Sequence, residues 1–189
     1  MADVNNALLT KTGWEVSEKK NGLWYNILAA KYLRNIDFWH ATQKQSDSYF
    51  WKGILQTRAT LRKGICIQIN NGTNTNIWDS PWVPTLSNFI PHPLHGMDQA
   101  HPELKVSDII TGNPKQWDLG KMQILFDRES NNEIQKIHIP TFSQLQDKMI
   151  WTQSKTGKFI VKSAYQVIIN RQSETSANEA QTQHLFKSI

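Results

Sequence analysis

Four basic side chains lie along one expected helix and at its end, where they could bind the phosphates of a nucleic acid. The helical pattern stops at Gly64, and the four residues are Lys52, Arg58, Arg62 and Lys63. Grouped Lys and Arg residues are typical of phosphate-binding surfaces. They are also typical of a helix C-terminus, whose partial negative charge they offset. The residues alone leave both interpretations open.

The excess positive charge lies in the N-terminal third of the chain. The 189 residues carry a formal net charge of +5. Residues 1–63 contain ten Lys and Arg residues and five Asp and Glu residues, whereas residues 64–189 contain eleven of each kind. A partner that is attracted by charge is therefore expected at residues 1–63.

Aromatic side chains supply a second chemistry, because nucleic-acid bases stack on them. Six tryptophans with aliphatic or aromatic neighbours are candidates: Trp24, Trp51, Trp78, Trp82, Trp117 and Trp151. Core packing is the favoured interpretation for most of them. Trp82 lies between Pro81 and Pro84, outside the regular patterns, so we assign base stacking to this residue.

No metal or cofactor site is expected. The proline-rich residues 84–104 contain His92, His95 and His101, but their spacing matches no zinc signature and the segment has no cysteine. These histidines are interpreted as solvated loop residues. The single cysteine, Cys66, sits at an apparent strand position and is interpreted as a small buried residue.

The residues that polymerase chemistry needs are missing from the chain. Two-metal catalysis requires clustered carboxylates, and the sequence has no adjacent Asp-Asp pair. It also has no Gly-x-Ser-x-Gly motif and no phosphate-binding glycine loop. We therefore expect no enzyme activity, and an enzyme of unrecognised type remains the least favoured hypothesis.

Helical patterns occupy the N-terminal part that must position the basic residues. Apolar residues recur at helical spacing in residues 3–19, from Asn21 to Leu33, and from Asp47 or Ser48 to Gly64. Residues 84–104 read as an irregular connector. Shorter helices are expected at residues 106–110, 117–130 and 163–169.

Two β-hairpins are expected downstream. Apolar residues alternate over residues 65–69 before Asn71-Gly72, which predicts a tight turn and pairing with residues 77–78. A second hairpin is expected from residues 148–152 and 158–161, and a short strand from residues 134–139. The predicted fold class is α+β, with a helical segment followed by a small mixed part that contains two hairpins and short helices.

The segment from Gly64 to Pro84, GICIQINNGTNTNIWDSPWVP, resembles part of plant non-LTR (LINE-type) retrotransposon polyproteins. The pattern of that family is Gly-Asn-Gly, then Ile-Trp, then Asp-x-Trp-x-Pro. The corresponding residues of this chain read Asn70-Asn71-Gly72, then Ile77-Trp78, then Asp79-Ser80-Pro81-Trp82-Val83-Pro84. Other stretches follow the order of that family: Asn6 to Lys11, Leu23-Trp24, Ser48 to Lys52, Leu61 to Gly64, Val106 to Ile110, Asp147 to Trp151 and Gly157 to Tyr165. The chain departs from the family at Ile67, where Trp is usual, and at Asn70, where Gly is usual.

The resemblance implies a connector that lies after the reverse transcriptase core and before a zinc-binding module and a ribonuclease H domain. Residues 1–63 would be a thumb-like or connector-like helical segment and residues 64–170 a mixed connector. Residues 171–189 would be a disordered tail with the truncated start of the zinc-binding module. The catalytic residues of the polyprotein would lie outside this chain.

The function implied by the resemblance is support of a neighbouring polymerase without catalysis. An RNA–DNA hybrid or another nucleic acid would be bound by Lys52, Arg58, Arg62, Lys63 and Trp82. The polymerase and ribonuclease H domains of the polyprotein would be the protein partners. The alternative is a protein–protein interaction module with no nucleic-acid role. The two predict opposite salt dependence, because binding to phosphates weakens as salt rises.

Membrane insertion and secretion are not expected. The sequence contains no apolar run long enough to span a bilayer and no basic start followed by an apolar signal core. We expect an intracellular protein, and the sequence does not separate nucleus from cytoplasm.

Overall fold

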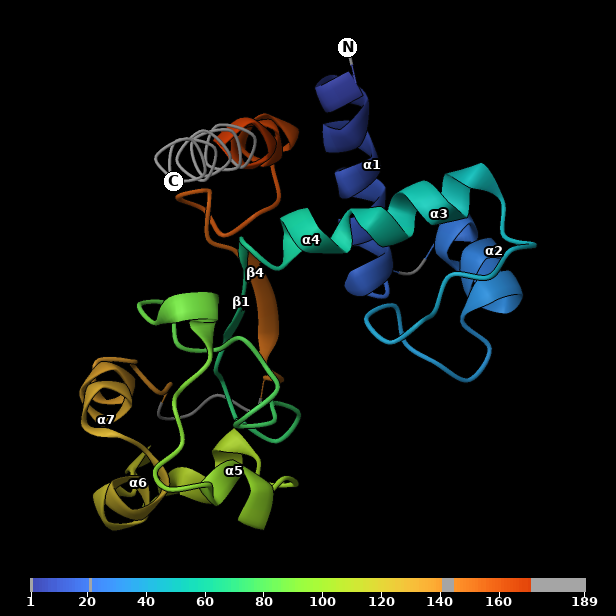
Figure 1. Cartoon of the computed structure of the whole chain (residues 1–189). Helices are drawn as coiled ribbons and strands as arrows, with labels where there is room; N and C mark the ends of the chain where they lie inside the picture. Colours follow the sequence, from blue (N-terminus) through green and yellow to red (C-terminus); the bar gives the residue numbers. More distant parts are fainter. Residues whose placement is uncertain (1, 21, 141–144, 171–189) are drawn as a thin grey trace, which may run out of the picture. The chain divides into compact units, whose positions relative to one another are not determined.

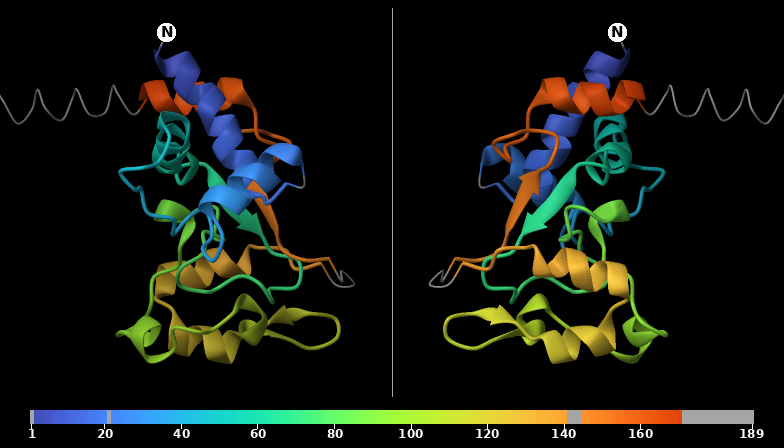
Figure 2. Two further views of the ribbon diagram at one scale, coloured as in Figure 1. Left: turned by 90° about the vertical axis from the view of Figure 1, so that its right-hand side faces the viewer. Right: turned by 90° about the vertical axis from the view of Figure 1, so that its left-hand side faces the viewer.

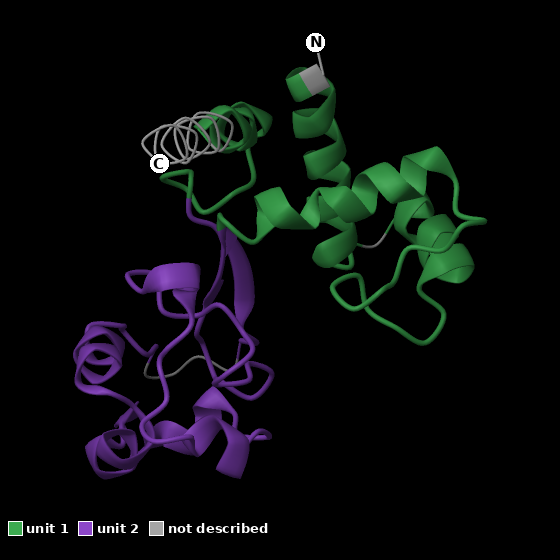
Figure 3. Cartoon of the chain, viewed as in Figure 1, with its two compact units in different colours: residues 1–64, 153–189 green, residues 65–152 purple. Residues whose placement is uncertain are grey.

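The computed structural model describes residues 2–20, 22–140 and 145–170 (Figure 1; two further views in Figure 2). The chain forms two units (Figure 3). Unit 1 consists of residues 1–64 and 153–189, and unit 2 consists of residues 65–152. Residues 153–170, which the sequence assigned to the mixed connector, therefore belong to the helical unit. The expected tail at residues 171–189 lies outside the described residues.

Unit 1 is built from helices, as expected. They are α1 (Ala2–Ser17), α2 (Leu23–Tyr32), α3 (Tyr49–Gln56), α4 (Arg58–Leu61) and a further helix over residues 161–170. Asn21, where the sequence predicted the start of the second helix, lies outside the described residues, and Gly22 occupies the N-cap position of α2. The long third helix is divided into α3 and α4 at Thr57.

The side chains of α2 and α3 lock together at the start of α3. The Ser48 hydroxyl accepts a hydrogen bond from Trp51 N at 3.2 Å and so caps the helix. The Tyr32 hydroxyl lies 3.0 Å from the same Ser48 oxygen. The Tyr32 ring stacks on the Trp51 ring, with 4.6 Å between centroids and 4° between planes. Because Trp51 is 1% exposed, this contact joins α2 to the core of unit 1.

Unit 2 carries two small antiparallel sheets and short helices. Strand β1 (Ile65–Gln68) pairs with β4 (Lys148–Trp151), and β2 (Ile110–Thr111) pairs with β3 (Gln116–Trp117). The helical elements are η1 (Ser87–Phe89), α5 (Met97–Ala100), η2 (Val106–Ile109), α6 (Leu119–Leu125) and α7 (Arg128–Gln135). Together with the helices of unit 1 they confirm the α+β class.

The two hairpins are not where the sequence predicted them. Ile65 pairs with Trp151 and Gln68 with Lys148, so the partner of β1 comes from the far end of the unit. The isolated bridge of Asn76 is to Lys105. Residues 158–160 form no strand, and the hairpin that does form joins β2 to β3. Local alternation correctly marked β1 but could not identify its partner.

The expected helix at residues 117–130 is divided, and the expected strand at residues 134–139 does not form. Asp118 accepts from Lys121 N and caps α6, while Asp127 accepts from Ser130 N and caps α7. Phe126 between them is extended. The second cap starts a new helix, which extends to Gln135.

A single carboxylate replaces the expected hairpin pairing. Asp147 Oδ1 accepts hydrogen bonds from the backbone N–H groups of Asn70, Asn71 and Gly72 at 2.8, 3.1 and 3.0 Å. Asp147 Oδ2 accepts from the Thr75 hydroxyl at 2.6 Å. The turn therefore wraps around a side chain just before β4 and holds β4 beside β1. The Asn70 side-chain amide adds a bond to the Gln146 carbonyl at 2.8 Å, which glycine at this position would lack.

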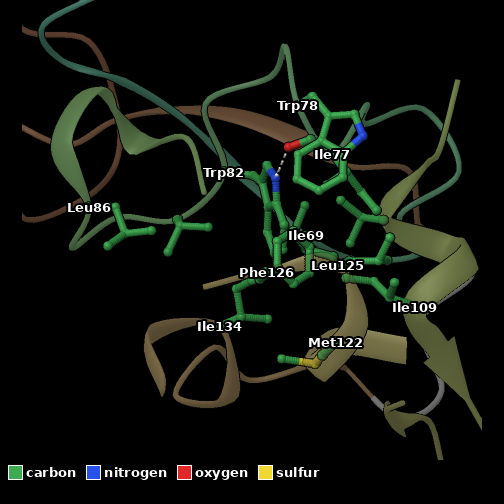
Figure 4. Close-up of a cluster of buried hydrophobic side chains, with 12 residues drawn as sticks. Ile69, Ile77, Trp78, Trp82, Leu86, Ile109, Met122, Leu125, Phe126 and Ile134 are labelled. Atoms are coloured by element: carbon green, nitrogen blue, oxygen red, sulfur yellow. Dashed lines mark hydrogen bonds between the residues drawn. The ribbon is translucent and has the colours of Figure 1, made fainter. Parts of the chain in front are cut away.

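The core of unit 2 collects apolar side chains from the loop after β1 and from the helices (Figure 4). Its members are Ile69, Ile77, Trp78, Trp82, Val83, Leu86, Val106, Ile109, Met122, Leu125, Phe126 and Ile134. The Trp78 and Phe126 rings lie 5.2 Å apart. The segment between β1 and η1, which has no regular helix or strand, is thus anchored by its apolar residues. In the described part of the chain, no helix is both long and apolar enough to cross a membrane.

The contact between α1 and the junction of α3 and α4 depends on a glycine. A Cβ atom added to Gly13 would clash with Thr57 Oγ1, and Thr57 is itself held by a 2.6 Å bond from its hydroxyl to the Ile54 carbonyl. We expect Gly13→Ala to lower the free energy of unfolding by about 1–3 kcal/mol through overpacking. Gly120→Ala in α6 is the matched control, because the added Cβ would have only ordinary contacts. Equal stability of both variants in urea unfolding would contradict the close approach.

Loss of the Asp147 carboxylate should destabilise unit 2. We expect Asp147→Ala to cost about 2–3 kcal/mol, because three backbone N–H groups lose a charged acceptor. Urea unfolding followed by tryptophan fluorescence measures this loss. Asp79→Ala is the control, since Asp79 is exposed and lies in the same unit. A cost no larger than that of the control would show that the turn does not need this carboxylate.

Candidate nucleic-acid interface

The fold separates charge between the two units more strongly than the sequence order suggests. Residues 1–64 and 153–170 of unit 1 contain thirteen Lys and Arg residues and five Asp and Glu residues. Unit 2 contains six basic and nine acidic residues. Formal net charges of +8 and −3 follow. The difference arises because residues 153–170 bring three lysines and no acid to the basic unit.

The four predicted phosphate contacts all lie on α3, on α4 or directly after α4, but they are not equivalent. Arg62 and Lys63 are exposed, whereas Lys52 and Arg58 are half-buried. Lys52 Nζ donates to the Gln45 carbonyl at 3.0 Å and lies 5.8 Å from the centroid of the Tyr49 ring. It remains at a surface, since Tyr49 is 94% exposed.

Arg58 is chiefly a structural residue. One of its terminal nitrogens donates to the Ala41 carbonyl at 2.6 Å, and the guanidinium lies 5.0 Å from the centroid of the Phe38 ring. Burial and then the charge of Arg62 lower the pKa of Arg58. Phe38 and Ala41 belong to the loop between α2 and α3, so Arg58 ties this loop to the helices. Its charge is less accessible to a phosphate than that of Arg62.

Arg62 is placed to act at the surface. Its guanidinium lies 5.7 Å from the centroid of the half-buried Trp39 ring, within the range of a cation–π contact. The adjacent Lys63 side chain is exposed. The exposed cations at the end of α4 thus lie next to an aromatic side chain that the sequence did not single out.

Trp82 does not form a stacking surface in the described structure. Its side chain is 1% exposed, its ring lies in the core of unit 2, and its indole N–H donates to the Ile77 carbonyl at 3.0 Å (Figure 4). A base needs an open ring face, which this burial removes. Trp82 has an irregular sequence context between Pro81 and Pro84, yet its side chain lies in the core of unit 2.

A pocket of about 300 Å³ in unit 1 was missed by the sequence reasoning. Lys19, Tyr25, Arg34, Asp37 and Trp39 are among its lining residues. They come from the residues just after α1, from α2 and from the loop after α2. No spacing rule connects them, because the fold alone brings these segments together. The aromatic pair Phe38-Trp39 after a basic helix end was the one available signal.

One of the three histidines that were expected to be solvated, His92, lies in a cluster of possible metal ligands. Among the described residues, His92, Asp127 and Glu129 offer ligand atoms that lie within 4.8 Å of one another, and neither His95 nor His101 joins them. The His92 Nδ1–Asp127 Oδ2 distance is 3.5 Å. Helix capping accounts for Asp127, and Glu129 lies in the first turn of α7.

Cys66 is a buried thiol in β1, as the sequence indicated. It is fully buried, and burial raises its pKa to about 12. The thiol is therefore protonated at neutral pH and is a poor nucleophile. This chemistry excludes Cys66 from the candidate site.

Two proteins of Arabidopsis thaliana are similar to this chain in sequence. One, named "Putative ribonuclease H protein", is 24% identical over 174 residues, which are 87% of this chain and 27% of that protein. The other, named as an uncharacterized mitochondrial protein, is 25% identical over 79 residues, which are 42% of this chain and 51% of that protein. The chain thus spans about a quarter and about half of these relatives. No family model matches the chain, and no solved structure is significantly similar to it.

The structural role of Arg58 predicts that its removal weakens the fold. We expect Arg58→Ala to lower the free energy of unfolding by about 1–3 kcal/mol, because it removes the hydrogen bond to Ala41 and the packing on Phe38. Arg62→Ala is the matched control at an exposed position and should change stability by less than about 0.5 kcal/mol. Thermal unfolding measures both. A smaller effect for Arg58 than for Arg62 would contradict the assigned roles.

Proposed function

We propose that this chain is a non-catalytic, nucleic-acid-binding segment of a retrotransposon reverse transcriptase-like polyprotein. The observation that carries the proposal is the formal charge of +8 on unit 1 beside −3 on unit 2. Phosphate backbones attract such a surface and release counterions when it binds. The name of the longer Arabidopsis relative, which refers to ribonuclease H, supports a setting in which nucleic acid is handled.

The non-catalytic part of the proposal is supported by what the acids of unit 2 do. Asp147 holds a turn, and Asp118 and Asp127 cap helices. These carboxylates are committed to the fold and are not gathered as a two-metal site would require. The resemblance to LINE-type polyproteins assigns the polymerase and ribonuclease H chemistry to neighbouring domains, which would be the protein partners of this segment.

Within unit 1, the phosphate contacts are assigned to Arg62, Lys63 and Lys52. Arg62 and Lys63 are exposed, and Lys52 lies beside exposed Tyr49. Arg58 supports the loop behind them. The resemblance favours an RNA–DNA hybrid as the polymer that these cations meet.

A protein-interaction module is the second candidate, and one observation favours it. Helix α2 leaves Leu23, Trp24 and Ile27 exposed by 77%, 69% and 51%. The centroids of the Trp24 and Phe50 rings lie 6.1 Å apart, and Phe50 is itself 42% exposed. Contiguous exposed apolar side chains of this kind are typical of surfaces that dock on another protein.

A salt series separates the two functions. We expect an RNA–DNA hybrid to bind at low salt and to weaken steeply as salt rises, because each phosphate contact releases a counterion. The double variant Arg62→Ala, Lys63→Ala should reduce the slope of log K against log salt by about two. Fluorescence polarisation with a labelled hybrid measures both quantities.

The matched control removes the same charge from the other unit. Arg128→Ala with Lys148→Ala changes two exposed cations of unit 2 and should leave hybrid binding unchanged. Absence of binding at low salt, or an equal loss in both double variants, would refute a phosphate-binding face on unit 1. Salt-insensitive association with another protein that is lost on Trp24→Ala would support the interaction module instead.

A further inference from the structure

We propose that the pocket of unit 1 binds one nucleotide of a single strand, with its base against Trp39 and Tyr25 and its phosphate near Lys19 and Arg34. This inference rests on the proposed nucleic-acid role and adds the class of ligand and the site. The pocket holds about 300 Å³ and is lined by residues from the end of α1, from α2 and from the segments after these two helices. That volume is at the lower end of small-ligand pockets and matches one nucleotide unit rather than a duplex.

The aromatic lining suits a base. Tyr25 and Trp39 both line the pocket, and both side chains are half-buried, so part of each ring stays accessible. Bases stack on such rings whatever their sequence, because every base has a π face. The sequence predicted base stacking at Trp82, and we assign it instead to Trp39.

A cation–π contact connects the pocket to the proposed phosphate face. The Arg62 guanidinium lies 5.7 Å from the centroid of the Trp39 ring. Trp39 therefore lines the pocket and also has beside its ring a cation, Arg62, that we assign to phosphate binding. A strand whose base enters the pocket would have its next phosphate within reach of the basic end of α4.

Lys19 is held in the pocket wall at a conformational cost. Its φ is +52°, in the left-handed region that glycine usually fills after a helix. Its backbone N–H donates to the Val16 carbonyl at 3.1 Å, which ends α1. A glycine would end the helix more easily, but only a cationic side chain would meet a phosphate here. Arg34, whose Nε donates to the Ala30 carbonyl at 3.0 Å, adds a second cation to the lining.

Asp37 is the one carboxylate that lines the pocket, and its oxygens are already engaged. Oδ1 accepts from the backbone N–H groups of Trp39 and His40, and Oδ2 lies 2.7 Å from His40 Nδ1. Burial opposes ionisation of Asp37, but these hydrogen bonds outweigh it and hold the pKa of Asp37 below its ordinary value. Its charge shapes the turn that presents Trp39, and the two lining cations outnumber it.

A paired base cannot use this pocket without leaving its duplex. Both faces of a paired base are covered by its neighbours in the stack, so insertion beside Trp39 requires unstacking and unpairing. A single strand avoids this cost. The pocket therefore predicts tighter binding of single strands than of the hybrid, whereas exposed cations alone would favour the denser charge of a duplex.

The test compares one short labelled RNA as a single strand and annealed to its DNA complement, on the full chain at low salt. We expect the single strand to bind more tightly, and Trp39→Ala to weaken it by about tenfold. Lys19→Gly should weaken single-strand binding by about threefold to tenfold while its thermal midpoint equals or exceeds that of the parent chain. This opposite movement of stability and binding separates a ligand contact from damage to the fold. Lys20→Ala is the control, an adjacent exposed cation outside the pocket lining.

The outcomes distinguish this inference from the proposed function. Hybrid binding that depends on Arg62 and Lys63, with no effect of Lys19→Gly or Trp39→Ala on the single strand, would overturn the pocket and leave the function standing. No binding of either RNA form at low salt would overturn both. Equal binding of poly-glutamate, with the same loss on Lys19→Gly, would identify an acidic polypeptide as the occupant and overturn the nucleotide site.

Discussion

The fold of unit 2 depends on one carboxylate, which accepts the backbone hydrogen bonds of a turn that is distant in sequence. Asp147 accepts three backbone N–H groups from residues 70–72 and the hydroxyl of Thr75, across more than seventy residues of sequence. Without a charged acceptor, these donors would lie partly buried and unpaired, which is costly. The bond set is adjacent to β4 and therefore fixes the strand that pairs with β1. A turn that looks local is thus completed by a non-local residue.

This pairing also determines how the chain is divided. Ile65 at the start of β1 lies opposite Trp151 at the end of β4, so the chain enters and leaves unit 2 at one end of a strand pair. Unit 2 is an insertion into unit 1. Residues 153–170 consequently return to the helical unit. There the Phe159 ring stacks on the Trp14 ring, with 5.4 Å between the ring centroids. Their three lysines raise the positive charge of the unit on which the proposed function rests.

The sequence predicted elements better than it predicted their partners. Helical spacing located the N-terminal helices, and the Ser48 cap of α3 was among the residues expected to start that helix. Alternation located β1 but paired it with the wrong segment, because Asn71-Gly72 predicts a turn without saying what satisfies it. The basic residues were found by composition. Their separation into exposed Arg62 and Lys63 and half-buried Arg58 required the packing of Phe38 and Ala41.

The sequence by itself determined the α+β class, the basic N-terminal part and the resemblance to plant retrotransposon polyproteins, because composition, periodicity and short motifs are local properties. Tertiary structure alone decided which tryptophan is buried and which lines a pocket. Trp82 has the more unusual sequence context, yet the core of unit 2 encloses it, while Trp39 stays half-exposed beside Arg62. Burial depends on which distant segments cover a side chain, and no local pattern specifies that.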